Sequence, residues 1–186
     1  MSDVAADDSD TLQAESSNAS QQFFGKYRGT VINNIDPMQL GRIQVIVPDV
    51  STFAPTSWAM PCLPVGGIQM GLFTVPIPGA GVWIEFEQGD PDYPIWVGCY
   101  WGSAVEVPAM ARAAPPGVPS MTLQTPLNTC VQLSDLPGPT GGIILKTVTA
   151  SLIINETGIY IQNGKGAMLT MIGNIVTINQ GALTVM

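Results

Sequence analysis

Apolar and polar positions alternate in short runs between residues 23 and 107. Turn signals divide these runs at intervals of roughly 8–12 residues, a spacing typical of small all-β domains. The cleanest alternation places Ile43, Val45 and Val47 on one face, and Pro48 then ends the run. We predict strands at 26–34, 41–47, 58–64, 81–87 and 94–100. The first two and the last two are expected to form antiparallel hairpins.

The number and spacing of these strands indicate a barrel. Five strands in about 80 residues, with a long irregular segment in the middle, match the small Greek-key barrel called the OB-fold. We therefore predict an OB-fold domain over residues 23–107. Residues 108–119 are rich in Pro and Ala, and proline cannot donate to a sheet ladder. This segment is predicted to be a linker.

The remaining residues, 120–186, form a loose repeat of apolar strands separated by Gly and Asn. Apolar residues two apart on a strand point to one face, as a half-buried strand requires. We predict strands at 121–125, 129–133, 142–146, 151–155, 158–162, 167–171, 174–178 and 182–186. The expected core consists of Ile159, Ile161, Leu169, Met171, Val176 and Ile178. The period of roughly 8–11 residues suggests a β-solenoid or an interleaved β-helix.

This repeat contains few charged residues, and their small number predicts that the chain assembles with other copies. Only Asp135, Glu156, Lys146 and Lys165 are charged in residues 120–186. One chain alone would expose apolar faces and unpaired strand edges, which natural proteins avoid by closure or coverage. Three chains that turn their apolar faces inward would remove both hazards. The predicted fold is therefore all-β, with an N-terminal OB-fold barrel followed by an interleaved trimeric β-helix or prism.

Residues 1–22 differ in composition from the rest of the chain. They carry acidic side chains and no basic ones, and Val4 and Leu12 are their only sizeable aliphatic residues. We expect this acidic N-terminal arm to be disordered on its own. The chain starts without a basic and apolar leader, so we expect a protein made in the cytoplasm without a signal peptide.

Composition argues against most catalytic and nucleic-acid functions. The 186 residues include no histidine, the commonest general acid–base and metal ligand. A net charge of −8 repels phosphate backbones. Cys62, Cys99 and Cys130 are too widely spaced for a metal knuckle, so we expect them to be small buried apolar residues. We predict no catalytic residues, no cofactor-binding residues, no metal site and no enzymatic activity.

Two residue groups nevertheless carry alternative interpretations. Asp90 and Asp92 flank Pro91 and form a possible carboxylate pair, although a turn role is the stronger interpretation. The tryptophans at positions 58, 83, 96 and 101 offer surfaces on which nucleic-acid bases stack. The alternative function is therefore an OB-fold binding module for carbohydrate or single-stranded nucleic acid, with a β-rich oligomerisation tail.

A longer pattern resembles a known family. It includes Gly29, Asp36, Pro37, Gly41, Arg42, Pro48, Trp58, Pro61, Gly71, Pro76, Gly79, Phe86, Gly89, Asp90, Pro91, Pro94 and Gly98. In the second half it includes residues 129–135, 143–147 and 158–161, with Asn163 and Gly164. This pattern resembles the phage baseplate assembly protein V and VgrG spike family of contractile injection systems. The likeness spans roughly residues 25–186.

The resemblance implies a structural role and a set of partners. It implies a homotrimeric central spike beneath the inner tube that pierces the target envelope when the sheath contracts, with only transient membrane contact. We expect a separate hub protein, a possible effector cargo, and placement in a phage virion or in an extracellular or membrane-anchored particle. A PAAR-type tip protein is expected to contact Leu183, Thr184, Val185 and Met186. The motif residues Asp36, Pro37, Gly41, Arg42, Gly89, Asp90 and Pro91 are expected to serve the fold.

Overall fold

The computed structural model describes residues 21–185, which form two compact units that meet between Gly102 and Ser103. The predicted roles of residues 1–20 and of Met186 lie outside the described residues. The described chain is built from β-strands and three short 3-10 turns, η1 Glu87–Gly89, η2 Ala104–Glu106 and η3 Asn179–Gly181. No helix in this part of the chain has the length and apolar character needed to cross a membrane. The expected all-β class is confirmed.

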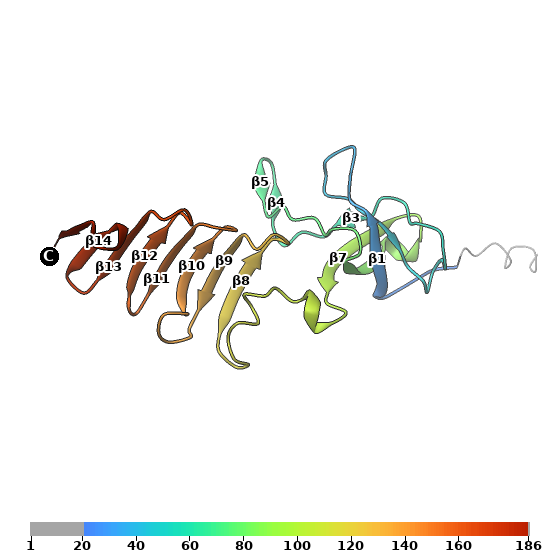
Figure 1. The fold of residues 1–186 in the computed structure, drawn as a ribbon. Helices are drawn as coiled ribbons and strands as arrows, with labels where there is room; N and C mark the ends of the chain where they lie inside the picture. Colours follow the sequence, from blue (N-terminus) through green and yellow to red (C-terminus); the bar gives the residue numbers. More distant parts are fainter. Residues whose placement is uncertain (1–20, 186) are drawn as a thin grey trace, which may run out of the picture. The chain divides into compact units, whose positions relative to one another are not determined.

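The first unit contains a curved five-stranded sheet of order β2-β1-β6-β7-β3 (Figure 1). Both predicted hairpins are present, because β1 pairs antiparallel with β2 and β6 pairs antiparallel with β7. Strand β3 pairs parallel to β7. A small hairpin of β4 and β5 was not predicted. The bounds are β1 Tyr27–Asn33, β2 Gln44–Ile46, β3 Met60–Pro61, β4 Gly66–Gly67, β5 Met70–Gly71, β6 Gly81–Phe86 and β7 Pro94–Tyr100.

The core of this unit lies on one face of the sheet. Alternation along β6 buries Val82, Ile84 and Phe86, while the residues between them are only partly buried. Trp96 is also buried, and its indole nitrogen donates a hydrogen bond to the carbonyl oxygen of Gly41 at 3.1 Å. That bond satisfies the one polar atom of a large core side chain. The remaining buried apolar residues are Val31, Ile43, Val45, Val47 and Ala59.

The second unit contains an eight-stranded antiparallel sheet in which every strand pairs with its neighbours in sequence. Figure 1 shows these strands side by side, from yellow β8 to red β14. All eight strands predicted for residues 120–186 are present, within about two residues at each end. Their bounds are β8 Ser120–Gln124, β9 Cys130–Ser134, β10 Gly142–Lys146, β11 Ser151–Asn155, β12 Gly158–Gln162, β13 Met168–Ile172, β14 Ile175–Ile178 and β15 Leu183–Val185. A single chain thus forms an open sheet with two distinct faces.

Candidate assembly surface

The eight-stranded sheet has one face made entirely of aliphatic side chains. Residues directly opposite each other in an antiparallel pair lie on the same face, so the register defines two columns across the sheet. One column contains Met121, Leu133, Ile143, Ile154, Ile159, Met171, Val176 and Val185. The other contains Leu123, Val131, Leu145, Leu152, Ile161, Leu169, Ile178 and Leu183. We call these two columns the apolar face.

The apolar face is uncovered in the single chain. Met121 and Leu123 on β8 are 70% and 72% exposed, and Leu183 and Val185 on β15 are also exposed. The positions between them are exposed or half-buried, and no residue of either column is buried. A continuous aliphatic surface of this length is larger than monomeric proteins normally leave in water. It is therefore a surface built to be covered.

The opposite face of the same sheet, here called the polar face, carries the polar side chains of the strands together with Ile144, Ile153, Ile172 and Ile175. Its hydrogen bonds link neighbouring strands: Gln162 Nε2 donates to Ser151 Oγ at 2.9 Å, and the hydroxyls of Thr170 and Thr177 pair. Tyr160 Oη and Thr157 Oγ1 lie 2.8 Å apart. Side chains of this kind face water without cost. The two faces thus differ in composition, because only the apolar face is aliphatic at every position.

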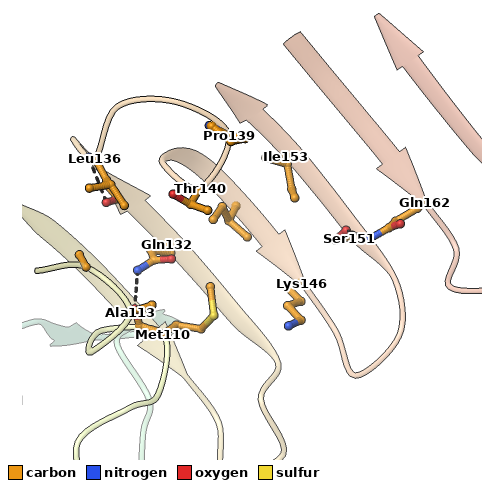
Figure 2. A pocket seen from close by; sticks show the side chains of 13 residues that line it. Met110, Ala113, Gln132, Leu136, Pro139, Thr140, Lys146, Ser151, Ile153 and Gln162 are labelled. Carbon is orange, nitrogen blue, oxygen red and sulfur yellow. Dashed lines mark hydrogen bonds between the residues drawn. The ribbon is translucent and has the colours of Figure 1, made fainter. Parts of the chain in front are cut away.

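The chain itself covers part of the polar face. A segment around Met110 lies over β8, β9 and β10, where Gln132 is 3% exposed and donates from Nε2 to the Met110 carbonyl oxygen at 2.8 Å. The Met110 amide in turn donates to Gln124 Oε1 at 3.2 Å. Figure 2 shows this contact beside a cavity of about 350 Å³. The apolar face has no such cover within the described chain.

The cavity has a lining unsuited to acid–base chemistry. Ile144 and Ile153 form its apolar part, and Lys146 is the one charged residue in the lining (Figure 2). Its other lining residues are Met110, Ala113, Ala114, Gln132, Ser134, Leu136, Pro139, Thr140, Ser151 and Gln162. Among the residues that the structure describes, no group of three or more His, Cys, Asp or Glu is placed to hold a metal ion.

The predicted core residues lie together on the apolar face. Ile159, Met171 and Val176 are neighbours in one column, and Ile161, Leu169 and Ile178 are neighbours in the other. Sequence reasoning missed the equivalent positions on β8 to β11, although each of those strands carries the same two-apart aliphatic pair. That pair is the signal by which all of them can be found.

Three of the four predicted tip residues, Leu183, Thr184 and Val185, form the last strand of the sheet, and Met186 lies outside the described residues. Leu183 pairs with Ile178 and Val185 pairs with Val176, so both extend the apolar columns. Thr184 pairs with Thr177. Their contact with a tip protein stays a prediction.

The loop between β1 and β2 is organised by Asp36. Its Oδ1 accepts from Arg42 Nη2 at 2.6 Å and from Arg42 Nε at 3.1 Å. The Met38 amide also donates to Asp36 Oδ1 at 3.0 Å, and the Leu40 amide donates to Asp36 Oδ2 at 2.8 Å. The side chains of Asp36 and Arg42 are only 4% and 16% exposed. The bond from Arg42, with the backbone amides, holds the pKa of Asp36 well below its usual range.

This arrangement gives the motif a structural role. Pro37 follows Asp36 at the start of the loop, and Gly41 adopts a φ of +78°, a conformation that favours glycine. The Arg42 guanidinium lies 5.4 Å from the centre of the Trp58 ring, in cation–π contact. The hydrogen bonds of the Asp36 carboxylate are thus made within the loop itself.

The second motif forms the turn between β6 and β7. Asp90 Oδ1 accepts from the Asp92 amide at 3.0 Å, and the Gly89 carbonyl oxygen accepts from the Phe23 amide at 2.8 Å. Pro91 lies between the two aspartates. Ser57 Oγ donates to the Asp92 carbonyl oxygen at 2.7 Å. These contacts indicate a turn role, because the Asp90 carboxylate accepts a hydrogen bond from a backbone amide.

The tryptophans do not form one stacking surface. Trp96 is in the core and Trp58 lies against Arg42. Trp83 packs against Tyr100 with ring centres 5.1 Å apart, and the guanidinium of Arg28 lies over both rings. Trp101 is exposed. A row of adjacent aromatic rings, on which successive bases would stack, is therefore not formed by these four residues.

The expectation that all three cysteines are buried is wrong. Cys130 is buried, as predicted, but Cys62 and Cys99 are exposed, and all three are free thiols. The expectation failed because it rested on the average behaviour of free cysteine. Cys62 directly follows the short edge strand β3, where one chain provides little cover.

Comparison with protein families divides the chain in the same order as the two sheets. Residues 27–101 match the type VI secretion system and phage-baseplate injector OB domain. Residues 120–184 match the phage baseplate V C-terminal trimerisation domain. A search of curated proteins gives no match. The second match supports a homotrimer, and it covers the strands that carry the apolar face.

Proposed function

The chain belongs to the baseplate V and VgrG-like spike family, and from that premise we propose that it is the trimeric central spike of a contractile injection system. Members of this family have a structural role in the baseplate, as part of a phage or injection particle. The proposed mechanism is mechanical: the trimer sits beneath the inner tube and pierces the target envelope when the sheath contracts. No chemical step is needed for this function, and we propose that the chain is not an enzyme.

The apolar face is the observation that carries this proposal. Three copies that turn their apolar faces toward a common axis would bury two aliphatic columns from each chain. Burying a large aliphatic side chain contributes on the order of 2 kcal/mol. The summed gain is large compared with the cost of association, so the monomer is the disfavoured state. The polar faces would then point outward, where water satisfies them.

The same arrangement makes a stiff and narrow needle. Each strand is only five residues or fewer, so three sheets around an axis enclose a thin interior filled by the aliphatic columns. Backbone hydrogen bonds run along the sheet from β8 to β15. We propose a three-sided prism of this kind for residues 120–186, in which each chain supplies one sheet, with the OB-fold barrel of 23–107 as its collar and residues 108–119 as the linker.

The proposed partners follow from the ends of the assembly. The last strand, β15, has no further strand beyond it in the described chain, and its free backbone edge is a template for another protein. We propose that a PAAR-type tip protein covers this edge and contacts Leu183, Thr184, Val185 and Met186. A separate hub protein and the inner tube would contact the OB-fold unit, and effector cargo is a further possible partner.

The alternative function, a carbohydrate or single-strand binding module, has weaker support. Its best observation is Arg28 stacked on Trp83 and Tyr100, which places a cation beside two aromatic rings. Titration of the intact protein with single-stranded oligonucleotides and with soluble glycans, followed by tryptophan fluorescence, separates the two functions. The spike function predicts no saturable quenching, and saturable micromolar quenching would support the alternative.

Particle assembly tests the spike function directly. Cells that make the particle but lack this chain should yield no complete particles, because the baseplate has no centre from which the inner tube starts. Electron microscopy of the released material gives the readout. Supplying the wild-type chain should restore complete particles. Complete, sheathed and tube-filled particles in the absence of the chain would contradict the proposal.

A further inference from the structure

The four charged side chains of residues 120–186 are segregated by strand end. Because successive strands run in opposite directions, the turns alternate between the two ends of the strands. Asp135 directly follows β9 and Glu156 lies in the turn from β11 to β12, so both acids lie at one end. Lys146 closes β10 and Lys165 lies in the turn from β12 to β13, so both lysines lie at the other. We call these the acidic end and the lysine end.

These four charged side chains have few interaction partners within their own chain. All four residues are exposed. The ion pairs found in residues 21–185 are Lys26 with Glu85 and Arg42 with Asp36, so none of the four takes part in one. Glu156 accepts a long hydrogen bond of 3.4 Å from the Gly138 amide. The two ends are separated by the length of a five-residue strand, about 14 Å, which prevents pairing within one sheet.

A ring of three copies brings the two ends together. When each apolar face points to a common axis that runs along the sheet, the strands run around the ring rather than along it. Rotational symmetry then makes every contact between neighbours heterologous, so the right-hand end of one sheet meets the left-hand end of the next. We propose that the lysine end of each copy pairs with the acidic end of its neighbour, through Lys146 with Asp135 and Lys165 with Glu156.

The heights of the charges along the sheet fit this pairing. Lys146 is at the level of β10, and Asp135 lies between β9 and β10, half a strand spacing lower. Lys165 lies between β12 and β13, and Glu156 lies between β11 and β12, one spacing lower. One spacing is about 4.8 Å, within reach of a lysine side chain. In both pairs the lysine lies farther along the sheet than the acid, so one small tilt of the strands shortens the lysine-to-carboxylate distance in both.

The ion pairs would mainly determine how neighbouring copies align along the axis, rather than add stability. Exposed ion pairs add little stability individually, whereas like charges brought together are strongly disfavoured. The aliphatic columns are uniform along the sheet, so on their own they allow neighbouring copies to slip by one or more strands. Charges at two fixed heights would select one axial register. This inference rests on the proposed trimer and adds to it which residues of neighbouring copies meet.

Zero-length cross-linking of the intact chain tests the pairing. A water-soluble carbodiimide activates a carboxylate, and a touching lysine amine displaces the urea to leave an amide between the two side chains. Lys26 and Glu85, which pair within one chain, provide the internal control. We expect amides between Lys146 and Asp135 and between Lys165 and Glu156 in peptide mass spectra, together with covalent dimers and trimers on a denaturing gel. Coupling of Lys26 with Glu85 alone, in a protein shown to be trimeric, would overturn the inference.

Charge reversal gives an independent test. Lys146→Glu with Lys165→Glu makes both ends acidic, and at low ionic strength the thermal midpoint of trimer dissociation should fall by several degrees. Adding Asp135→Lys and Glu156→Lys to the same chain reverses every pair and should restore most of the loss. Adding only Asp49→Lys, an exposed change in the barrel, to the double variant restores half of its lost net charge away from the sheet and should not restore the midpoint. Equal losses in the double and quadruple variants would contradict the pairing.

These experiments distinguish a failure of the proposed trimer from a failure of the proposed charge pairing. Light scattering on the wild-type chain comes first, and a monomer there removes the proposed trimer itself. A wild-type trimer without the expected amides or the charge rescue leaves the trimer in place and removes only the pairing of the two ends.

Discussion

Asp36 directs the loop between β1 and β2 with both of its carboxylate oxygens. It accepts hydrogen bonds from the Arg42 guanidinium and from the backbone amides of Met38, Leu40 and Arg42. The structure identifies Asp36 as the carboxylate that Arg42 reaches, whereas the sequence predicts only that Gly41 lets the chain reverse and that Arg42 can reach a carboxylate. The sequence does not predict the amide bonds, since these depend on the positive φ values of Gln39 and Gly41.

Removing the charge of Asp36 should destabilise the barrel in a pH-dependent way. The pKa of Asp36 is lowered in the folded state, so its contribution is fully present above the unfolded pKa of about 3.9 and is lost as the pH falls below that value. We expect Asp36→Asn to lower the thermal midpoint at pH 7, and the gap to the wild type to narrow progressively as the pH falls below about 4 toward the lowered folded-state pKa of Asp36. Thermal melts of both proteins across this range provide the measurement.

Glu85→Gln is the matched control for Asp36→Asn. It removes a carboxylate whose lysine partner is exposed, so its effect should stay within about 1 kcal/mol. An equal or larger effect of Glu85→Gln at pH 7 would contradict the role given to Asp36.

At the scale of elements, the turns of the eight-stranded sheet pack on one another. Gly164 lies in the turn from β12 to β13 at φ +68°, and a Cβ there would lie 2.3 Å from the Thr149 carbonyl oxygen in the turn from β10 to β11. Gly166, in the same turn, has φ +102° and open space around it. The two glycines therefore share a backbone requirement and differ in what surrounds them.

That difference predicts unequal effects of alanine. Gly166→Ala should cost about 1 kcal/mol for its backbone conformation alone. Gly164→Ala should cost clearly more, because the two turns must also move apart. Denaturant unfolding of the two variants gives the comparison, and equal losses would show that the turns do not pack as described.

The strands of this sheet were predictable and the small hairpin of the barrel was not. Two aliphatic residues two apart mark each strand from β8 to β15. The β4 and β5 strands consist of Gly66, Gly67, Met70 and Gly71, which show no alternation. Their pairing depends on a turn rather than on a buried face, so periodicity has nothing to detect there.

At the scale of the whole molecule, the sequence predicts assembly but not its geometry. Few charges and many aliphatic pairs indicate that residues 120–186 need partners. The two columns of the apolar face and the separation of acids from lysines depend on which residues lie opposite each other. That register is set by turn lengths, such as the long 135–141 connection, and sequence patterns do not fix it.

A charge on the apolar face should prevent assembly, whereas the same charge one residue away should not. Ile161 and Gln162 are adjacent and exposed on β12, and they point to opposite faces. Ile161→Asp would bury three carboxylates around the axis, so we expect it to abolish the trimer and complete particles. Gln162→Asp should retain both. Analytical ultracentrifugation gives the readout, and trimers of Ile161→Asp would contradict the inward orientation of the face.

The mass of the intact wild-type chain in solution tests the central claim most directly. The account requires the apolar face to be covered by two further copies, so multi-angle light scattering should give three times the mass of one chain, unchanged on dilution into the nanomolar range. A stable, fully folded and soluble single chain would contradict it.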